Sequence, residues 1–250
     1  MDILAIQKDY YDRRWAREKF ANTLQGSRCA AILGEIARLD INQPRILDLG
    51  CGSGWLSAIL GQFGPTTGVD LSDHVLREAC KLYPWVRFYT ANILEWEEAS
   101  HLGKFDIVVS QEVIEHVSDK PKYLRVAFDF LKDGGTLLLT TPNARTFAAM
   151  QEHVRRSWSD QPFEELLTPK RLKQMVCSLF EIVDARTIIS AGSKGLYRIV
   201  NSYKLGKILE NLGLHRAFEA AGLWAGFGLH TFVVARKPAP RIPKLSYASK

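Results

Sequence analysis

The chain has 250 residues, with 33 Lys and Arg against 27 Asp and Glu, so that its formal net charge is +6. Hydrophobic residues make up 46% and charged residues 24%, a globular composition that excludes a disordered or fibrous chain. Residues 1–144 carry 16 basic and 19 acidic residues, whereas residues 145–250 carry 17 and 8. The positive excess therefore belongs to the second part of the chain.

Cysteine use and hydropathy indicate the compartment. Cys29, Cys51, Cys80 and Cys177 form no CxxC pair, which argues against a zinc ribbon and fits free thiols in a reducing compartment. The first twenty residues carry charges throughout, so we expect no signal peptide. The longest uncharged run, Ala220–Ala235, is too short for a membrane span and is interrupted by glycines. We expect a cytoplasmic monomer or homodimer without stable membrane insertion.

In chain order, residues 3–39 are predicted to form two helices, after which short apolar runs alternate with helical stretches. This alternation indicates βαβ units and a parallel sheet. The expected strands are Arg45–Leu49, Thr66–Asp70, Val86–Thr90, Phe105–Val109, Thr136–Thr140, Phe180–Ile188 and His230–Arg236. The expected helices are Trp55–Phe63, His74–Tyr83, Lys122–Leu131, Pro169–Val176 and an insert at 194–226. We predict an α/β fold with a Rossmann-like, seven-stranded, mostly parallel sheet and helices on both faces.

The most specific motif is a glycine-rich turn that follows the first strand. Gly50, Gly52 and Gly54 lead from this strand into a helix, which lets a ligand lie against the backbone. Asp70 ends the next strand, where a carboxylate can accept hydrogen bonds from both ribose hydroxyls of a nucleoside. NAD and S-adenosylmethionine both fit this outline.

Asp48, just before the turn, favours S-adenosylmethionine. A carboxylate repels the two phosphates of a dinucleotide but attracts a sulfonium and an ammonium group. The GxGxG spacing also differs from the GxGxxG dinucleotide fingerprint. The alternative is that Gly50–Gly54 forms only a tight turn and that Asp70 only caps a helix.

Residues 44–143 resemble the class I S-adenosylmethionine-dependent methyltransferases, nearest in motif to the small-molecule O-methyltransferases of ubiquinone biosynthesis. The resemblance lies in the segments DLGCGSG at 48–54, GVDLS around Asp70, TANI around Asn92, FDIVVSQEVIEHV at 105–117 and LKDGGTLLLTTPN at 131–143. It implies that the loop holds the methionine part of the cofactor, Asp70 the ribose, and Asn92 the adenine amino group, where the family often has Asp. The implied cofactor contacts are Asp48, Gly50, Cys51, Gly52, Gly54, Trp55, Asp70, Leu71, Asn92, Ile93, Gln111 and Tyr11.

The resemblance also predicts one domain over residues 1–236. Its parts are N-terminal helices (1–43), a cofactor-binding core (44–143), an acceptor-side cap and strand (144–228) and a last strand (229–236). Residues 237–250 contain three prolines and no apolar periodicity, and we expect a mobile basic tail.

The segment after the fourth strand is expected to carry the chemistry. His116 is its only histidine, and an ordinary pKa of about 6.5 suits a general base at neutral pH. We expect His116 and Glu112 to be catalytic. The alternative is that the segment begins a helix whose polar groups only fix the loop.

Glu112, Glu115 and His116 form an ExxEH motif, which on a helix would place all three on one side. Such a set can hold Mg²⁺, and it looks like the metal-binding segment of ubiquinone-biosynthesis O-methyltransferases and of small-RNA 3′-terminal 2′-O-methyltransferases. The RNA enzymes have a further ligand after the fifth strand, where this chain has Arg145. A bound metal is therefore possible but not expected.

Two other regions are expected to frame the site. Tyr10, Tyr11 and Trp15 lie at near-helical spacing, which predicts either a lid over the cofactor or an aromatic face docked on the core. His230 begins the last strand and is expected to be structural. Polar and aromatic residues of loop 143–167 are expected to shape acceptor specificity or to be solvated: His153, Trp158, Glu164 and Glu165.

The insert at 194–226 is amphipathic, with basic residues on its polar positions. We expect it to cap the acceptor pocket; the alternatives are a dimer contact or a surface that meets a lipid. Together these features predict methyl transfer from S-adenosylmethionine to a hydroxyl of a small molecule in a biosynthetic pathway. The alternatives are a small-molecule N-methyltransferase, a metal-dependent RNA 3′-terminal 2′-O-methyltransferase and a non-catalytic regulatory protein. No nucleic-acid partner is expected, because the sequence has no basic stripe with stacking aromatics.

Overall fold

The computed structural model describes residues 3–17, 22–96, 101–152, 163–200 and 202–240. Its centre is one seven-stranded sheet in the order β3-β2-β1-β4-β5-β7-β6. Strands β1 to β5 run parallel, and β7 pairs antiparallel with both β5 and β6. The strands are β1 (Ile46–Leu49), β2 (Thr66–Asp70), β3 (Arg87–Thr90), β4 (Phe105–Gln111), β5 (Leu131–Pro142), β6 (Glu181–Ser190) and β7 (Gly228–Arg236). The predicted mostly parallel sheet is confirmed.

Helices cover both faces of the sheet because its central strands are apolar on both sides. On one face, Ile32 of α2 and Leu60 of α3 belong to the same buried cluster as Ile46 of β1. On the other face, Leu124 of α5 packs in a cluster with Leu47. The helices are α1 (Ile3–Arg17), α2 (Thr23–Arg38), α3 (Trp55–Leu60), α4 (Asp73–Leu82), α5 (Lys120–Phe130), α6 (Ala144–Ala148), α8 (Pro169–Val176), α9 (Leu196–Val200), α10 (Tyr203–Asn211) and α11 (His215–Trp224).

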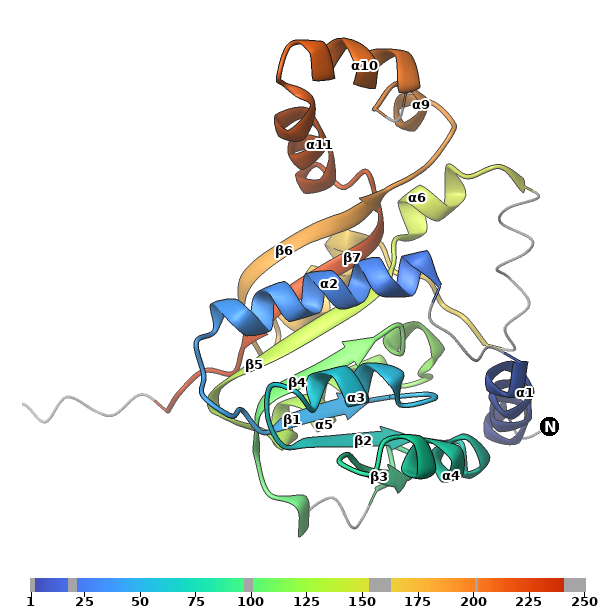
Figure 1. Cartoon of the computed structure of the whole chain (residues 1–250), viewed down its shortest axis with the longest axis vertical. Coiled ribbons are helices and arrows are strands. Elements are labelled where there is room, and N and C mark those ends of the chain that lie inside the picture. Colours follow the sequence, from blue (N-terminus) through green and yellow to red (C-terminus); the bar gives the residue numbers. More distant parts are fainter. Residues whose placement is uncertain (1–2, 18–21, 97–100, 153–162, 201, 241–250) are drawn as a thin grey trace, which may run out of the picture.

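The carboxyl ends of β1, β2 and β4 point toward α1, which lies across this edge of the sheet (Figure 1). Two polar contacts join α1 to α4 and its cap: Lys8 forms an ion pair of 2.6 Å with Asp73, and the Ser72 hydroxyl donates a hydrogen bond to Asp12. Helices α9 to α11 project beyond the end of the sheet at β6 and β7. Among the described segments, no helix combines the length and the apolar character that a bilayer span requires.

Asn143 joins the end of β5 to the start of β7. It is fully buried, and its side-chain amide donates hydrogen bonds to the backbone oxygens of Gly226 at 3.0 Å and Gly228 at 2.9 Å. Its side-chain oxygen also accepts from the backbone N–H of Arg145, which caps α6. A single side chain therefore fixes the relative positions of three elements at the carboxyl edge.

Replacing Asn143 by alanine is expected to lower the free energy of unfolding by about 2–3 kcal/mol, because the buried Gly226 oxygen loses its donor and α6 loses its cap. Urea unfolding followed by circular dichroism measures this. Asn211→Ala, at the exposed end of α10, is the control and should change stability by less than about 0.5 kcal/mol. An N143A midpoint equal to that of the unmodified protein would contradict this role.

Candidate functional site

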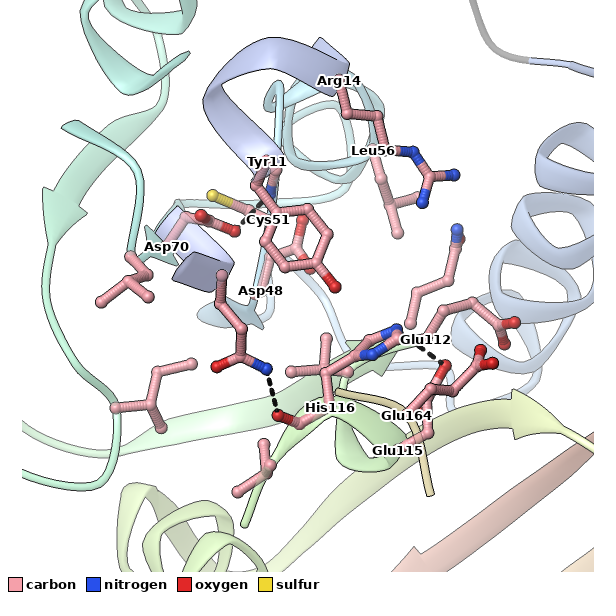
Figure 2. A pocket seen from close by; sticks show the side chains of 18 of the residues that line it. Tyr11, Arg14, Asp48, Cys51, Leu56, Asp70, Glu112, Glu115, His116 and Glu164 are labelled. Carbon is pink, nitrogen blue, oxygen red and sulfur yellow. Dashed lines mark hydrogen bonds and ion pairs between the residues drawn. The ribbon is translucent and has the colours of Figure 1, made fainter. Parts of the chain in front are cut away.

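A cavity of about 630 Å³ opens at the carboxyl edge of the sheet, between the glycine-rich loop, the end of β4 and α1. Figure 2 shows the side chains around it. All of the predicted cofactor contacts line this cavity except Gly54. Gly54 begins α3 with a φ of 75°, and a Cβ there would lie 2.7 Å from the Phe88 ring. Its role is to permit the turn.

The glycine-rich loop is held against β2 by Asp70. One carboxylate oxygen of Asp70 accepts the backbone N–H of Gly52 at 2.8 Å, and the other accepts that of Ser72 at 3.0 Å. Gly50 adopts a φ of 76°, and a Cβ there would lie 2.4 Å from Val113. Each carboxylate oxygen keeps a second lone pair, so Asp70 can hold the loop and still accept ligand hydroxyls.

Asp48 is a buried carboxylate on the wall of the same cavity. It accepts a hydrogen bond of 2.6 Å from the Ser57 hydroxyl, and none of its described partners is a cation. Burial raises the pKa of Asp48 to about 7. A ligand cation placed here would stabilise the ionised carboxylate, so the donor set suits a sulfonium or an ammonium group and not a phosphate.

Asn92 lies at the end of the cavity beyond Asp70. Its side-chain oxygen accepts the backbone N–H of Leu94 at 3.2 Å, and its amide donates to Glu95 at 3.1 Å. Asn92 and Ile93 both line the cavity. The amide oxygen retains a lone pair, and its use by an adenine amino group remains a prediction.

The segment after β4 does not form the helix on which a shared face of Glu112, Glu115 and His116 depends. Only Ile114–His116 forms a short 3₁₀ turn, and Glu112 has a φ of 57°, in the left-handed region that non-glycine residues rarely adopt. The expectation that Glu112, Glu115 and His116 share one helical face is therefore wrong. Each of these three side chains points to a different partner.

His116 faces the cavity with one ring nitrogen. Its Nδ1 lies 2.9 Å from the backbone oxygen of Phe163, and its own backbone oxygen accepts a hydrogen bond of 2.9 Å from Gln7. The Tyr11 ring packs edge-on against the imidazole at 5.9 Å. Because a carbonyl oxygen only accepts, Nδ1 carries the proton of neutral His116 and Nε2 keeps a lone pair. Burial lowers the pKa of His116, which favours this neutral form.

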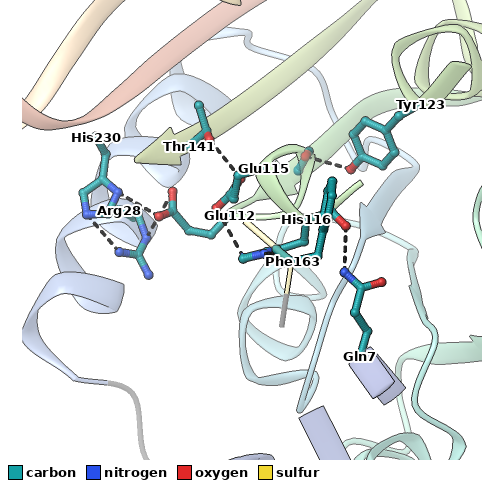
Figure 3. A network of polar contacts seen from close by, with 10 residues as sticks. Gln7, Arg28, Glu112, Glu115, His116, Tyr123, Thr141, Phe163 and His230 are labelled. Carbon is teal, nitrogen blue, oxygen red and sulfur yellow. Dashed lines mark hydrogen bonds and ion pairs between the residues drawn. The ribbon is translucent and has the colours of Figure 1, made fainter. Parts of the chain in front are cut away.

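Glu112 belongs to a buried network with Arg28 of α2 and His230 of β7 (Figure 3). Its carboxylate lies 2.8 Å from His230 Nδ1 and 3.9 Å from Arg28 Nε, and Arg28 Nη1 lies 3.2 Å from His230 Nε2. Since Arg28 can only donate, the proton of neutral His230 resides on Nδ1, facing Glu112. Burial opposes ionisation of Glu112, but His230 and Arg28 outweigh it and lower the pKa of Glu112 to about 2.

Glu115 has the opposite protonation preference. It is buried and accepts a hydrogen bond of 2.8 Å from the Thr141 hydroxyl. Burial and the neighbouring charge of Glu112 raise its pKa well above the ordinary value. The pKa values of these two neighbouring carboxyl groups are thus shifted in opposite directions.

The candidate metal ligands do not fit a metal ion. Glu112 is paired with a guanidinium, Glu115 favours the protonated form, and His116 Nδ1 is bound to a carbonyl. Across residues 3–17, 22–96, 101–152, 163–200 and 202–240, no three His, Cys, Asp or Glu side chains lie close enough to hold a metal ion.

Several lining residues were not predicted from the sequence. Gln7, Arg28 and Phe163 reach the cavity, and His230 is part of the network at its wall. Gln7 lies four residues before Tyr11 on α1, a spacing that places both on one helical face. Arg28 had no comparable signal, because its partner is 202 residues away.

The predicted acceptor loop is only partly described. Glu164 lines the cavity, whereas Glu165 is exposed and forms an ion pair of 2.7 Å with Lys120. His153 and Trp158 lie outside the described residues. For Trp15, the structure describes only the backbone within α1. The insert supplies none of the described lining residues, and its role as a cap stays a prediction.

The chain matches a family model and several curated relatives. A family model described as a methyltransferase domain matches residues 20–223. The ubiquinone biosynthesis O-methyltransferase of Xanthomonas oryzae pv. oryzae (strain PXO99A) is 38% identical over 117 residues, which cover 45% of this chain and 48% of the relative. The chain thus spans about half the length of the curated relatives it matches.

Two solved structures resemble this one at low sequence identity. The N-methyltransferase NodS from Bradyrhizobium japonicum WM9, in complex with S-adenosyl-L-homocysteine, has a TM-score of 0.62 at 13% identity and covers 93% of this chain and 99% of its own. The magnesium protoporphyrin IX methyltransferase of Synechocystis PCC 6803 has a TM-score of 0.59 at 16% identity and covers 94% and 100%. These similarities confirm the fold that the sequence resemblance implies.

Replacing His230 by leucine is expected to destabilise the protein by about 3 kcal/mol, because Glu112 loses its closest partner in a buried position. Glu115→Gln is the matched control and should cost less than about 0.5 kcal/mol, since Glu115 already favours its neutral form. Guanidinium unfolding at pH 7 compares the two variants. Equal losses of stability in both would contradict the assignment of charge to Glu112.

Proposed function

Because the chain belongs to the family of methyltransferase domains, we propose that it transfers a methyl group from S-adenosylmethionine to a hydroxyl oxygen of a small-molecule acceptor. The observation that carries the proposal is a single cavity whose wall includes Asp48 and Asp70 at one end and His116 at the other. The cofactor supplies an electrophilic methyl on its sulfonium when bound. The protein has to align the acceptor and remove its proton.

The cofactor-binding end of the cavity combines the loop backbone with two carboxylates. Asp70 is positioned for the ribose hydroxyls, since its oxygens are fixed by Gly52 and Ser72 and retain lone pairs. Asp48 lies on the wall near the loop and lacks a cationic protein partner. These features support binding of a nucleoside joined to a cationic amino-acid group.

His116 supports proton removal from an acceptor hydroxyl. The backbone oxygen of Phe163 accepts a hydrogen bond from Nδ1 of neutral His116. The lone pair on Nε2 is therefore available to take a proton. Nε2 lies 3.8 Å from a carboxyl oxygen of Glu115, whose protonated form presents no competing negative charge. We assign His116 the role of general base for an acceptor bound beside Glu112.

Glu112 is suited to orientation of the acceptor. With a pKa of about 2 it remains charged at neutral pH and is too weak a base to take a hydroxyl proton. Its Oε1 has no hydrogen-bond donor among the described residues. The Glu112 side chain lines the cavity and is 18% exposed, so an acceptor can lie beside this charge with its reacting oxygen toward His116.

S-Adenosylmethionine is expected to bind about tenfold more tightly at pH 8 than at pH 6. A bound cation favours ionised Asp48, and the pKa of Asp48 in the free protein is about 7. Isothermal titration calorimetry at both pH values measures the affinity. Asp48→Asn should bind more weakly and lose this contribution to the pH dependence. Failure to bind either S-adenosylmethionine or S-adenosylhomocysteine would overturn the proposed cofactor.

His116→Asn is expected to lower turnover by about 10²- to 10⁴-fold while cofactor affinity changes little. The asparagine amide can still donate to the Phe163 oxygen, so the change removes the base and retains the contact. Radiolabelled methyl transfer to a panel of small phenols and catechols measures turnover, and mass spectrometry locates the methyl group. In the unmodified protein, with S-adenosylmethionine saturating at every pH, kcat/KM for the acceptor should fall with acid only below the ordinary imidazole pKa of about 6.5, because burial lowers the pKa of His116.

Unchanged turnover in the His116→Asn variant would remove His116 as the base. A matched panel of primary amines distinguishes oxygen from nitrogen as the acceptor atom. Methylation of amines alone, with no dependence on His116, would replace the proposal by N-methyl transfer.

A further inference from the structure

Helices α9, α10 and α11 form an amphipathic unit with no buried side chain in any of the three. The unit stands clear of the sheet at the end of β6 and β7 (Figure 1). It packs on the rest of the chain through residues of α9 and α11: the Tyr197 ring contacts Phe227 at 4.9 Å, and the Leu223 oxygen accepts a hydrogen bond from Thr187. One side of the unit is therefore attached and the remainder faces solvent.

Large apolar side chains are concentrated on this exposed surface. Of the twelve large hydrophobic side chains that are exposed in the described part of the chain, seven belong to this unit and its short connections. Their exposed fractions range from 52% to 80%, the last value belonging to Trp224. The seven are Leu196, Ile199, Tyr203, Ile208, Leu212, Leu214 and Trp224. Clustered exposure of this kind marks an interaction surface, whereas single exposed apolar residues do not.

The unit also carries positive charge. Residues 194–226 include five basic side chains against Glu210 and Glu219. The Lys207 ammonium lies 5.7 Å from the centre of the exposed Tyr203 ring, so a basic and an aromatic group are presented together. The basic residues are Lys194, Arg198, Lys204, Lys207 and Arg216.

We propose that the α9–α11 unit binds the surface of an anionic lipid bilayer, with its apolar side chains in the interface and its basic side chains at the acidic headgroups. A surface with both features matches the chemistry of a peripheral membrane contact. A second copy of the chain would bring a second positive surface against the first, which is unfavourable. The unit contributes none of the described cavity-lining residues, so this contact leaves the cavity lining unchanged.

Flotation with lipid vesicles tests the proposal on the full chain without cofactor or substrate. Vesicles of phosphatidylcholine with 3 parts in 10 phosphatidylglycerol are expected to retain the protein, and vesicles of phosphatidylcholine alone to retain about tenfold less. Raising the salt concentration should release the protein, because screening weakens the contribution of the basic side chains. Failure of the anionic vesicles to retain the protein, or equal retention on both, overturns the proposal.

Two double variants separate the apolar and basic contributions. Ile208→Ser with Leu212→Ser removes two apolar groups, and Lys204→Glu with Lys207→Glu reverses two charges. Each is expected to lower retention about tenfold. Leu82→Ser with Val183→Ser is the matched control, because these side chains are 63% and 61% exposed against 57% and 64% for Ile208 and Leu212. The control should bind vesicles as the unmodified protein does.

The outcomes decide between a membrane and a second copy of the chain. Sedimentation equilibrium that shows a dimer, lost in the Ile208→Ser/Leu212→Ser variant, together with no retention on vesicles, assigns the surface to dimerisation and overturns the proposal. Should the apolar variant fail to fold, as judged by circular dichroism, the charge-reversed variant still decides, because its two lysines are exposed. Full retention of the Lys204→Glu/Lys207→Glu variant on anionic vesicles would also overturn the proposal.

Discussion

The buried carboxylate of Glu112 imposes the constraint on which the carboxyl edge of the sheet depends. An ionised group removed from water needs close partners, and here Arg28 and His230 provide them. The three residues come from α2, the end of β4 and the start of β7, so one ion-pair network joins elements that are far apart in the sequence. It also accounts for the left-handed backbone at Glu112, since the surrounding contacts compensate for a conformation that costs about 1–2 kcal/mol.

The left-handed backbone at Glu112 also determines where the neighbouring polar groups lie. Because the chain leaves β4 at Glu112 in a left-handed conformation, the next residues form a short 3₁₀ turn and not a helix. Glu115 then meets Thr141, while His116 meets the Phe163 oxygen. The negative charge of Glu112 in turn raises the pKa of Glu115. The pKa values of two neighbouring carboxyl groups are thus shifted in opposite directions, an arrangement typical of sites that handle protons.

The sequence predicted the parts of this structure that have local causes. Strands such as β1 and β4 are apolar on both faces, and the glycine-rich turn needs positive φ, so both leave a pattern in consecutive residues. β5 begins at Leu131, earlier than predicted, because Leu131 pairs with Phe105 before the chain reaches Gly134. The sequence left open whether the ExxEH segment is helical, and no local signal disclosed that Glu112 would be fixed by Arg28 and His230. The charged network depends on tertiary contacts, and for that reason it could not be predicted from one sequence.

The attachment of α1 bears on how a ligand enters the cavity. Gln7 and Tyr11 of α1 close the cavity above His116, through a hydrogen bond from Gln7 to the His116 backbone oxygen and a ring contact of Tyr11 with the imidazole. The ion pair of Lys8 with Asp73 is partly exposed, and such pairs contribute only about 0–1 kcal/mol. Helix α1 meets the Asp70 end of the cavity through the Asp12–Ser72 hydrogen bond and the His116 end through Gln7 and Tyr11, so it borders both ends of the space that a ligand would occupy.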